Sequence, residues 1–194
     1  MRPAVFLDRD GTINEQMGYI NHLSRFHLLP GVAAAIRLLN QAGVPVVVVS
    51  NQSGVGRGYF PASLVNEVHD MMKNELAREE ARVDGLYFCP HHPEAKVEEY
   101  RLACHCRKPK IGMFEAAARE MGLDLSASYV VGDRWTDLKA AANCGATGVL
   151  VLTGYGRGDL LYMAPVEAVK PRHVAEDLHA AVQWILQDMA ARTR

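Results

Sequence analysis

Short apolar runs alternate along the chain with longer segments in which apolar residues recur at helical spacing. Each apolar run is short enough for a buried strand, and polar or glycine residues follow it. These runs predict five strands, at 4–7, 44–49, 85–89, 129–131 and 148–152. Proline or glycine bounds several of the intervening segments, as is typical of helices. The expected helices lie between Gly31 and Gly43, from Pro61 to Leu76, and at 112–121, 136–143 and 174–189.

Strands and helices that alternate in this way build a parallel sheet covered by helices on both faces. The sequence therefore predicts an α/β fold with a doubly wound, mainly parallel, Rossmann-like sheet. No repeat or linker divides the chain, so we expect residues 1–194 to form one domain. Residues 90–107 have no regular period, which predicts a long loop. In such sheets ligands bind beyond the carboxyl ends of the strands.

The composition excludes several classes of protein. The 194 residues include 21 lysines and arginines and 22 aspartates and glutamates, and this net charge of −1 argues against a general nucleic-acid binder. No apolar run approaches the ~18 residues of a membrane span, and the first residues do not resemble a signal peptide. Three of the four cysteines lie close together, which favours a metal site over disulfides and predicts a cytoplasmic protein.

Two carboxylates follow the first strand. Asp8 and Asp10 leave the strand end two residues apart, and Gly11 permits a sharp turn. Carboxylates this close repel each other, so a cation is needed to neutralise them. Mg²⁺ suits the pair, because it takes oxygen ligands and keeps water molecules that a phosphate can replace. Considered alone, the pair is equally compatible with a loop of two solvated aspartates.

Groups that suit a phosphate follow other strands. Residues 50–54 offer hydroxyl and backbone N–H donors after the second strand. Arg107 and Lys108 supply positive charge just after the irregular loop, and Asp133 supplies a third carboxylate after the fourth strand. Each feature is a weak signal by itself, but their shared position at strand ends predicts one site.

Taken in order, these motifs resemble those of the haloacid dehalogenase superfamily. They are Asp8-Arg-Asp10-Gly-Thr12, Ser50-Asn51, Lys108-Pro109 and Gly132-Asp133-x-x-x-Asp137, within a match that spans residues 4 to about 153. The resemblance implies a phosphatase. Asp8 would be the nucleophile that forms an aspartyl-phosphate, and Asp10 would be the general acid and then the general base.

The resemblance also implies how charge is balanced during the reaction. Ser50 and Lys108 would hold the transferring oxygens. The catalytic Mg²⁺ would have three protein ligands: Asp8, the backbone carbonyl of Asp10, and Asp133. Asp137 would orient neighbouring groups rather than bind the metal.

Two pairs of candidate metal ligands lie in the irregular loop. They are Cys89-Pro-His91 and Cys104-His-Cys106, and three thiolates with an imidazole suit a tetrahedral Zn²⁺. A structural zinc ion would order the loop at about 89–107, which has little apolar content of its own. Two other histidines compete for the fourth position: His92 and His105. The alternative is three unrelated core cysteines.

The zinc-loop pattern resembles two groups within the superfamily, the phosphatases of D-glycero-D-manno-heptose 1,7-bisphosphate and those of histidinol phosphate. Residues 51–58 and the long spacing between the zinc pairs resemble the heptose enzymes, which remove the 7-phosphate in bacterial ADP-heptose and lipopolysaccharide core synthesis. The short segment between Asp10 and Ser50 leaves room for a minimal cap only, so we expect an open cleft. The resemblance implies these substrate contacts: Gln16, Met17, Gly18, Tyr19, Ser50, Asn51, Gln52, Ser53, Arg107, Lys108 and Arg134.

The expected partner is therefore a small-molecule sugar bisphosphate, with no nucleic acid or membrane, and we expect a monomer. Two alternatives stay open: a histidinol-phosphate phosphatase, and a non-catalytic binding module stabilised by zinc. Outside the site, Trp184 is expected to pack the last helix onto the sheet, and Cys144 to be a small core residue near a helix end. His69 and His179 lie on amphipathic helices and are expected at the surface.

Overall fold

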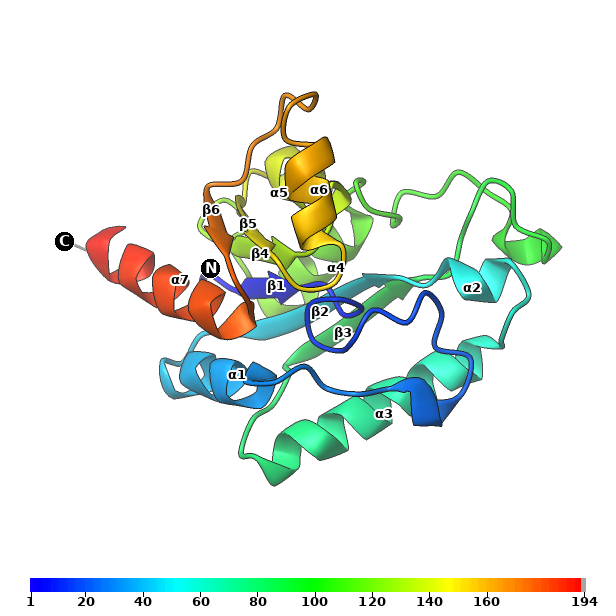
Figure 1. Cartoon of the computed structure of the whole chain (residues 1–194), viewed down its shortest axis with the longest axis horizontal. Helices are drawn as coiled ribbons and strands as arrows, with labels where there is room; N and C mark the ends of the chain where they lie inside the picture. The colour runs from blue at the N-terminus through cyan, green and yellow to red at the C-terminus, as the bar shows by residue number, and fades with distance from the viewer. Residues whose placement is uncertain (193–194) are drawn as a thin grey trace.

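The computed structural model describes residues 1–192 and is built around a six-stranded parallel sheet (Figure 1). The strands are β1 (Val5–Leu7), β2 (Val46–Asn51), β3 (Gly85–Cys89), β4 (Tyr129–Gly132), β5 (Thr147–Val151) and β6 (His173–Ala175). Their order is β3-β2-β1-β4-β5-β6, and neighbouring strands run parallel. The expected α/β class with a parallel sheet is confirmed.

Helices cover both faces of this sheet, as expected. They are α1 (Val32–Gln41), α2 (Ser53–Gly56), α3 (Ala62–Arg78), α4 (Gly112–Met121), α5 (Trp135–Cys144), α6 (Gly156–Tyr162) and α7 (Leu178–Arg192), with 3-10 turns η1 (Leu23–Arg25) and η2 (Glu98–Tyr100). α1, α3 and α7 pack on one face, and α4 and α5 pack on the other. Among residues 1–192, no helix combines the length and apolar character needed to cross a membrane.

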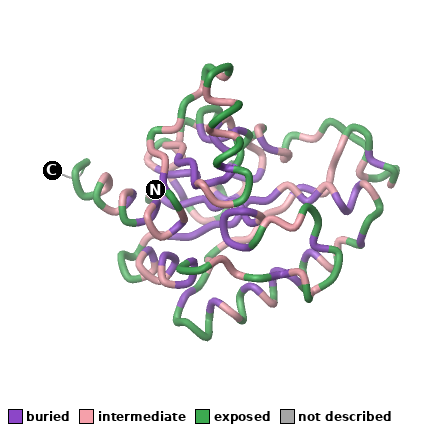
Figure 2. Tube along the Cα trace, viewed as in Figure 1, coloured by how far each residue is buried: buried purple, intermediate pink, exposed green. Residues whose placement is uncertain are grey.

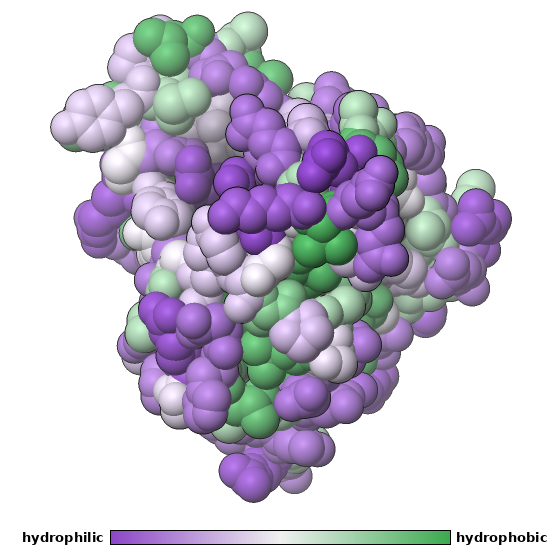
Figure 3. Space-filling view, turned by 90° about the vertical axis from the view of Figure 1, so that its right-hand side faces the viewer, coloured by the Kyte–Doolittle hydropathy of each residue, from purple (hydrophilic) through white to green (hydrophobic). Residues whose placement is uncertain are grey.

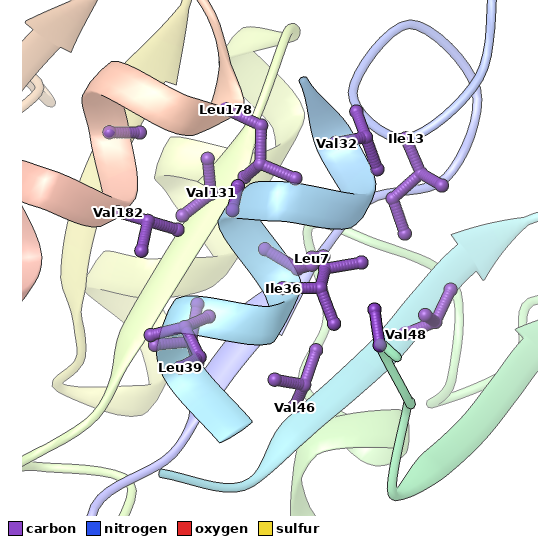
Figure 4. Close-up of a cluster of buried hydrophobic side chains, with 14 of the residues drawn as sticks. Leu7, Ile13, Val32, Ile36, Leu39, Val46, Val48, Val131, Leu178 and Val182 are labelled. Atoms are coloured by element: carbon purple, nitrogen blue, oxygen red, sulfur yellow. The ribbon is translucent and has the colours of Figure 1, made fainter. Parts of the chain in front are cut away.

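Each face of the sheet has its own core, because successive side chains of a strand point to opposite faces. Leu7 packs with Ile36 of α1 and other residues of one core, and Phe6 packs against Phe114 of α4 on the other face, with ring centroids 5.1 Å apart. Figure 2 shows the buried positions concentrated in the strands, and Figure 4 shows side chains of α1, α7 and the strands meeting in the first core. Each such side chain contributes ~1.5–3 kcal/mol by burial.

The central position of β1 determines where a site can form. Leu7 pairs with Val48 of β2 and with Val131 of β4, so the residues that follow these three strands emerge side by side. Asp8 N extends the ladder by donating to Val131 O at 2.9 Å. The chain continues from β1 to β2 and β3 on one side and returns to β4 on the other. Ligands bind at such a switch point in open α/β sheets.

The end of the chain differs from the sequence prediction. Helix α7 begins at Leu178 instead of 174, and Val174 belongs to a sixth strand that was not predicted. Val174 packs against the cluster that contains Trp135, and β6 pairs with β5, so a neighbour distant in sequence decides its conformation. Asp177 then caps α7, since its Oδ1 accepts from Ala180 N at 2.8 Å. The short helices α2 and α6 were also not predicted, because seven residues or fewer show little periodicity.

The expectation for His69 is wrong. This residue of α3 is 4% exposed and lies edge-on to Phe88, with ring centroids 5.9 Å apart. Burial, followed by the charge of Arg9, lowers the pKa of His69 to about 4, so it is neutral at pH 7. The expectations for two other residues are confirmed: Trp184 packs its helix against the sheet core, and Cys144 is the last residue of α5 and lies against the opposite core.

Candidate active site

A buried lysine joins two carboxylates at the carboxyl ends of the strands. Lys108 Nζ lies 2.8 Å from Asp8 Oδ1 and 2.7 Å from Asp137 Oδ1. It also donates to Val49 O at 2.8 Å. Burial alone lowers the pKa of Lys108, but Asp137 and Asp8 outweigh burial and raise this pKa above its ordinary value. Lys108 is therefore a fixed positive charge beside Asp8.

Asp133 lies at the end of β4 with no exposed surface. Its Oδ2 accepts from Tyr155 N at 2.8 Å, whereas its Oδ1 is buried and lacks a hydrogen-bond partner among residues 1–192. The backbone closes tightly around this carboxylate, because a Cβ atom added to Gly11 or Gly154 would lie 2.2 Å from Asp133 Oδ2. Burial, followed by nearby carboxylates, raises the pKa of Asp133 to about 8.

Three carboxylates share this small volume. One oxygen from each of Asp8, Asp133 and Asp137 lies within 4.8 Å of the others. Burial raises the pKa of Asp8 to about 6, although Lys108 opposes the shift. Three carboxylates here face one buried lysine, and Asp133 Oδ1 has no hydrogen-bond partner among residues 1–192, so the site favours a further cation. Both oxygens of Asp137 face protein donors, since Oδ1 lies 2.7 Å from Lys108 Nζ and Oδ2 accepts from Arg134 N at 3.2 Å, whereas Lys108 contacts Asp8 through Oδ1 only. A hard divalent cation therefore fits best between Asp8 and Asp133.

Asp10 is held by a separate set of donors. Arg9 approaches both of its oxygens through Nη2, at 3.1 and 2.9 Å, and Asn14 Nδ2 donates to Oδ1 at 3.0 Å. Gln52 Nε2 donates to Oδ2 at 2.7 Å. Burial alone raises the pKa of Asp10, but Arg9 and these hydrogen bonds hold it below its ordinary value. Arg9 is only 1% exposed, and its burial is tolerated because the charge is paired.

Most of the residues expected to contact substrate line a polar cleft of about 490 Å³. Figure 3 views the side of the molecule on which the strands end, where hydrophilic side chains gather around a strip of hydrophobic ones. The cleft is lined by Asp8, Asp10, Gln16, Gly18, Tyr19, Ser50, Asn51, Ser53, Arg107, Lys108, Arg134, Thr136, Asp137 and Tyr155. Two residues expected to contact substrate, Met17 and Gln52, are absent from this lining. Thr136 and Tyr155 line it although the sequence analysis did not select them.

Two arginines reach the cleft from different loops. Arg107 donates to His91 O at 3.4 Å, which ties it to the cysteine-rich loop. Arg134 lies 3.2 Å from Asp159 and stacks over the Tyr155 ring at 4.6 Å from its centroid. The Arg134 side chain is 46% exposed, and an exposed ion pair is worth ~0–1 kcal/mol, so this guanidinium can turn to an anion in the cleft at little cost.

The cysteine-rich loop brings four candidate zinc ligands together, as predicted. The Sγ atoms of Cys89, Cys104 and Cys106 and the Nδ1 of His91 all lie within 4.8 Å of one another. Cys89 Sγ is 3.4 Å from Cys104 Sγ and 3.0 Å from Cys106 Sγ, and the cysteines are free. Three thiolates and one imidazole suit a closed tetrahedral Zn²⁺ site.

The competing histidines point elsewhere. His92 Nε2 lies 3.2 Å from Arg57 Nη2, and His105 Nε2 lies 2.6 Å from Glu115 Oε2. Of the three candidates, His91 is therefore the one that joins the cysteine cluster. The same loop is tied to the cleft through its backbone, since Gln52 N donates to Cys89 O at 2.8 Å.

Comparison with known proteins agrees with this geometry. The sequence model of the haloacid dehalogenase-like hydrolases matches residues 15–142, and that of the HAD-hydrolase-like proteins matches residues 105–181. The chain belongs to the haloacid dehalogenase-like hydrolase family. The first resemblance drawn from the motifs is thereby confirmed.

Several relatives within this family are similar over their whole length. The chain is 45% identical over 195 residues to the D-glycero-D-manno-heptose-1,7-bisphosphate 7-phosphatase of Thermosynechococcus vestitus, covering 98% of this chain and 99% of the relative. It is 41% identical over 190 residues to the D-glycero-beta-D-manno-heptose-1,7-bisphosphate 7-phosphatase of Escherichia coli K12, covering 97% and 90%. It also superimposes on the crystal structure of the D,D-heptose 1,7-bisphosphate phosphatase of B. bronchiseptica complexed with magnesium and phosphate, with a TM-score of 0.84, 37% identity and coverage of 97% and 99%.

In this member of the hydrolase family, sequence reasoning found the residues at the strand ends but missed those that support them. The predicted convergence of Asp8, Lys108 and Asp133 is observed. The buried position of Arg9 was not predicted, although an arginine between two aspartates at the end of a buried strand is a usable signal. The inward turn of Gln52 has no local signal, because its partners lie on other segments of the chain.

Proposed function

We propose that the protein is a magnesium-dependent phosphatase that removes the 7-phosphate of D-glycero-D-manno-heptose 1,7-bisphosphate. The observation that carries the proposal is the Asp8 carboxylate, which lines the cleft beside Lys108 and has an oxygen within 4.8 Å of one from Asp133. The names of the relatives support the choice of substrate. The product would serve the synthesis of bacterial ADP-heptose and the lipopolysaccharide core. In this proposal residues 1–194 form one cytoplasmic, monomeric phosphatase domain.

The arrangement supports catalysis by two carboxylates. Asp8 attacks the phosphorus of the 7-phosphate and forms an aspartyl-phosphate, while the bond to the sugar oxygen breaks. Asp10, once it has taken up a proton from solvent, gives it to that oxygen, and later takes one back from the water that hydrolyses the aspartyl-phosphate. Ser50 donates to a transferring oxygen, and the charge of Lys108 lies beside the attacking carboxylate and offsets the negative charge that develops.

The metal would be held by Asp8, Asp133 and the backbone carbonyl of Asp10, where it supplies positive charge for the transferring phosphoryl group and keeps Asp8 ionised. Asp137 instead positions Lys108 through the contact of 2.7 Å. The zinc site would use Cys89, His91, Cys104 and Cys106, which fill four positions. A site without an open position is structural.

The far end of the substrate carries a second phosphate. Arg107 and Arg134 line the cleft and supply cations with paired donors, which suit a phosphate. Gln16, Gly18 and Tyr19 line the same cleft and offer polar contacts to the sugar. Met17 is not needed for these contacts, because it does not line the cleft.

The experiment that tests the proposal compares phosphate release from three substrates in the presence of Mg²⁺: heptose 1,7-bisphosphate, fructose bisphosphate and histidinol phosphate. We expect kcat/KM to be highest for the heptose compound. A higher value for histidinol phosphate would instead favour the histidinol-phosphate phosphatases. No release from any of them would favour a binding module.

The Asp8→Asn variant is the control for this experiment. It keeps the size of the side chain but removes the nucleophile, so phosphate release is expected to fall to background while the far-ultraviolet circular dichroism spectrum is unchanged. Turnover near that of the parent would contradict the assignment of Asp8.

A further inference from the structure

The side chain of Gln52 is buried and faces inward, which the sequence analysis did not predict. Gln52 lies directly before α2 and is 5% exposed, and its side chain turns away from the cleft lining. Its Nε2 donates to Asp10 Oδ2 at 2.7 Å and to Ser50 Oγ at 2.7 Å. One amide group thus connects the proposed acid–base residue with the proposed phosphoryl-binding hydroxyl.

The direction of these hydrogen bonds follows from chemistry. Both Asp10 oxygens accept from neighbouring donors, Oδ1 from Asn14 and Oδ2 from Arg9, so the N–H side of the Gln52 amide faces Asp10. The second N–H then points at Ser50 Oγ. Because that oxygen accepts from Gln52, its own proton is free to be donated elsewhere. The Ser50 hydroxyl is thereby oriented as a donor toward a phosphoryl oxygen in the cleft.

The same amide restricts Asp10. Arg9 and Asn14 hold Oδ1, whereas Oδ2 has Gln52 and the Arg9 Nη2 group as its donors. Loss of Gln52 leaves Oδ2 with a single donor and allows the carboxylate to rotate. The backbone of Gln52 is itself anchored, since its N–H donates to Cys89 O in the cysteine-rich loop.

We propose that Gln52 is a positioning residue that holds the Asp10 carboxylate and the Ser50 hydroxyl in the orientations needed for phosphoryl transfer. Gln52 is absent from the cleft lining and acts through these two residues. This inference rests on the proposed phosphatase activity. A positioning role, unlike a purely structural one, predicts that substitution of Gln52 lowers kcat more for a substrate whose leaving group needs a proton.

The experiment uses two substitutions and two substrates. Gln52→Met keeps the length of the side chain without its donors, and Gln52→Asn keeps the amide but is too short to reach both partners. Gln187, exposed on α7, supplies matched controls with the same substitutions. Each protein is assayed with Mg²⁺ on heptose bisphosphate, whose alkoxide leaving group needs an acid, and on 4-nitrophenyl phosphate, whose leaving group does not.

We expect kcat for the sugar bisphosphate to fall ~100-fold in both Gln52 variants, within the usual contribution of a positioned acid, with KM changed less than about threefold. For 4-nitrophenyl phosphate we expect only a ~10-fold loss, because the misdirected Ser50 still weakens transfer. The Gln187 variants should match the parent. Equal losses on both substrates, or none, would overturn the role of Gln52. A parent protein that releases phosphate from neither would instead overturn the proposed function. If Gln52→Met does not fold, Gln52→Asn decides the matter alone.

Discussion

Asp133 offers a test in which a substitution in the site should stabilise the metal-free protein. The pKa of this buried carboxyl is raised from 3.8 to about 8, chiefly by burial. A folded state that binds a proton more tightly than the unfolded chain loses stability as pH rises from the unfolded to the folded pKa. The contribution of Asp133 is therefore most favourable below pH 4, is lost progressively up to about pH 8, and is constant above it.

The size of the effect on the free energy of unfolding follows from the pH range between the unfolded and folded pKa values. Each pH unit above the unfolded pKa costs about 1.4 kcal/mol, so the ionisable group costs up to about 4 kcal/mol at pH 7. Asp133→Asn removes this cost and keeps the shape, and its amide oxygen can still accept from Tyr155 N. The new N–H group is buried and costs ~1–3 kcal/mol where it lacks a partner. We therefore expect a net gain of ~1–3 kcal/mol at pH 7 and little or no gain at pH 4.5.

The assay is urea unfolding in buffer without divalent cations, followed by tryptophan fluorescence, with the zinc content of both proteins checked by metal analysis. Addition of Mg²⁺ should stabilise the parent by ~2.7 kcal/mol at a hundredfold excess over Kd, and should leave Asp133→Asn unchanged. Asp70→Asn, on the exposed side of α3, is the matched control and should change stability by less than ~0.5 kcal/mol. A metal-free Asp133→Asn protein that is less stable than the parent at pH 7 would refute the reasoning.

Three further predictions follow from the same structure. Metal analysis of the purified protein should find about one zinc per chain, and Cys106→Ser should lower both the zinc content and the melting temperature. A parent protein without zinc would contradict the assignment of the zinc site. Gly11→Ala should abolish Mg²⁺-dependent activity, because the new Cβ atom would lie 2.2 Å from Asp133 Oδ2, and near-normal turnover would contradict that packing. Leu39→Ala should lower the free energy of unfolding by ~2–5 kcal/mol in urea titrations, since Leu39 is fully buried, while kcat at 25 °C stays near the parent value.

The zinc loop shows how far local spacing can lead. Two close pairs of ligands in a polar loop predicted the cluster, and the structure brings both pairs together. Spacing also favoured His91, because Cys-x-His mirrors the Cys-x-Cys pair, and the structure confirms that choice, since His92 and His105 have partners outside the cluster. Spacing thus identifies the candidate zinc ligands, and the structure of the loop shows which of them come together.

The sequence by itself determined the first five strands, the longer helices and the chemistry at the strand ends. These depend on local patterns: the apolar period decides strand or helix, and the polar residues after Leu7 and Val131 stand at the sheet edge whatever surrounds them. The tertiary structure alone decided that Val174 forms a strand, that Arg9 is buried against Asp10, and that Gln52 faces inward. The conformations of these residues depend on contacts that include segments distant along the chain. Burying a charge or an amide costs free energy unless such a segment supplies a hydrogen-bond or ionic partner. No local window of sequence contains that information.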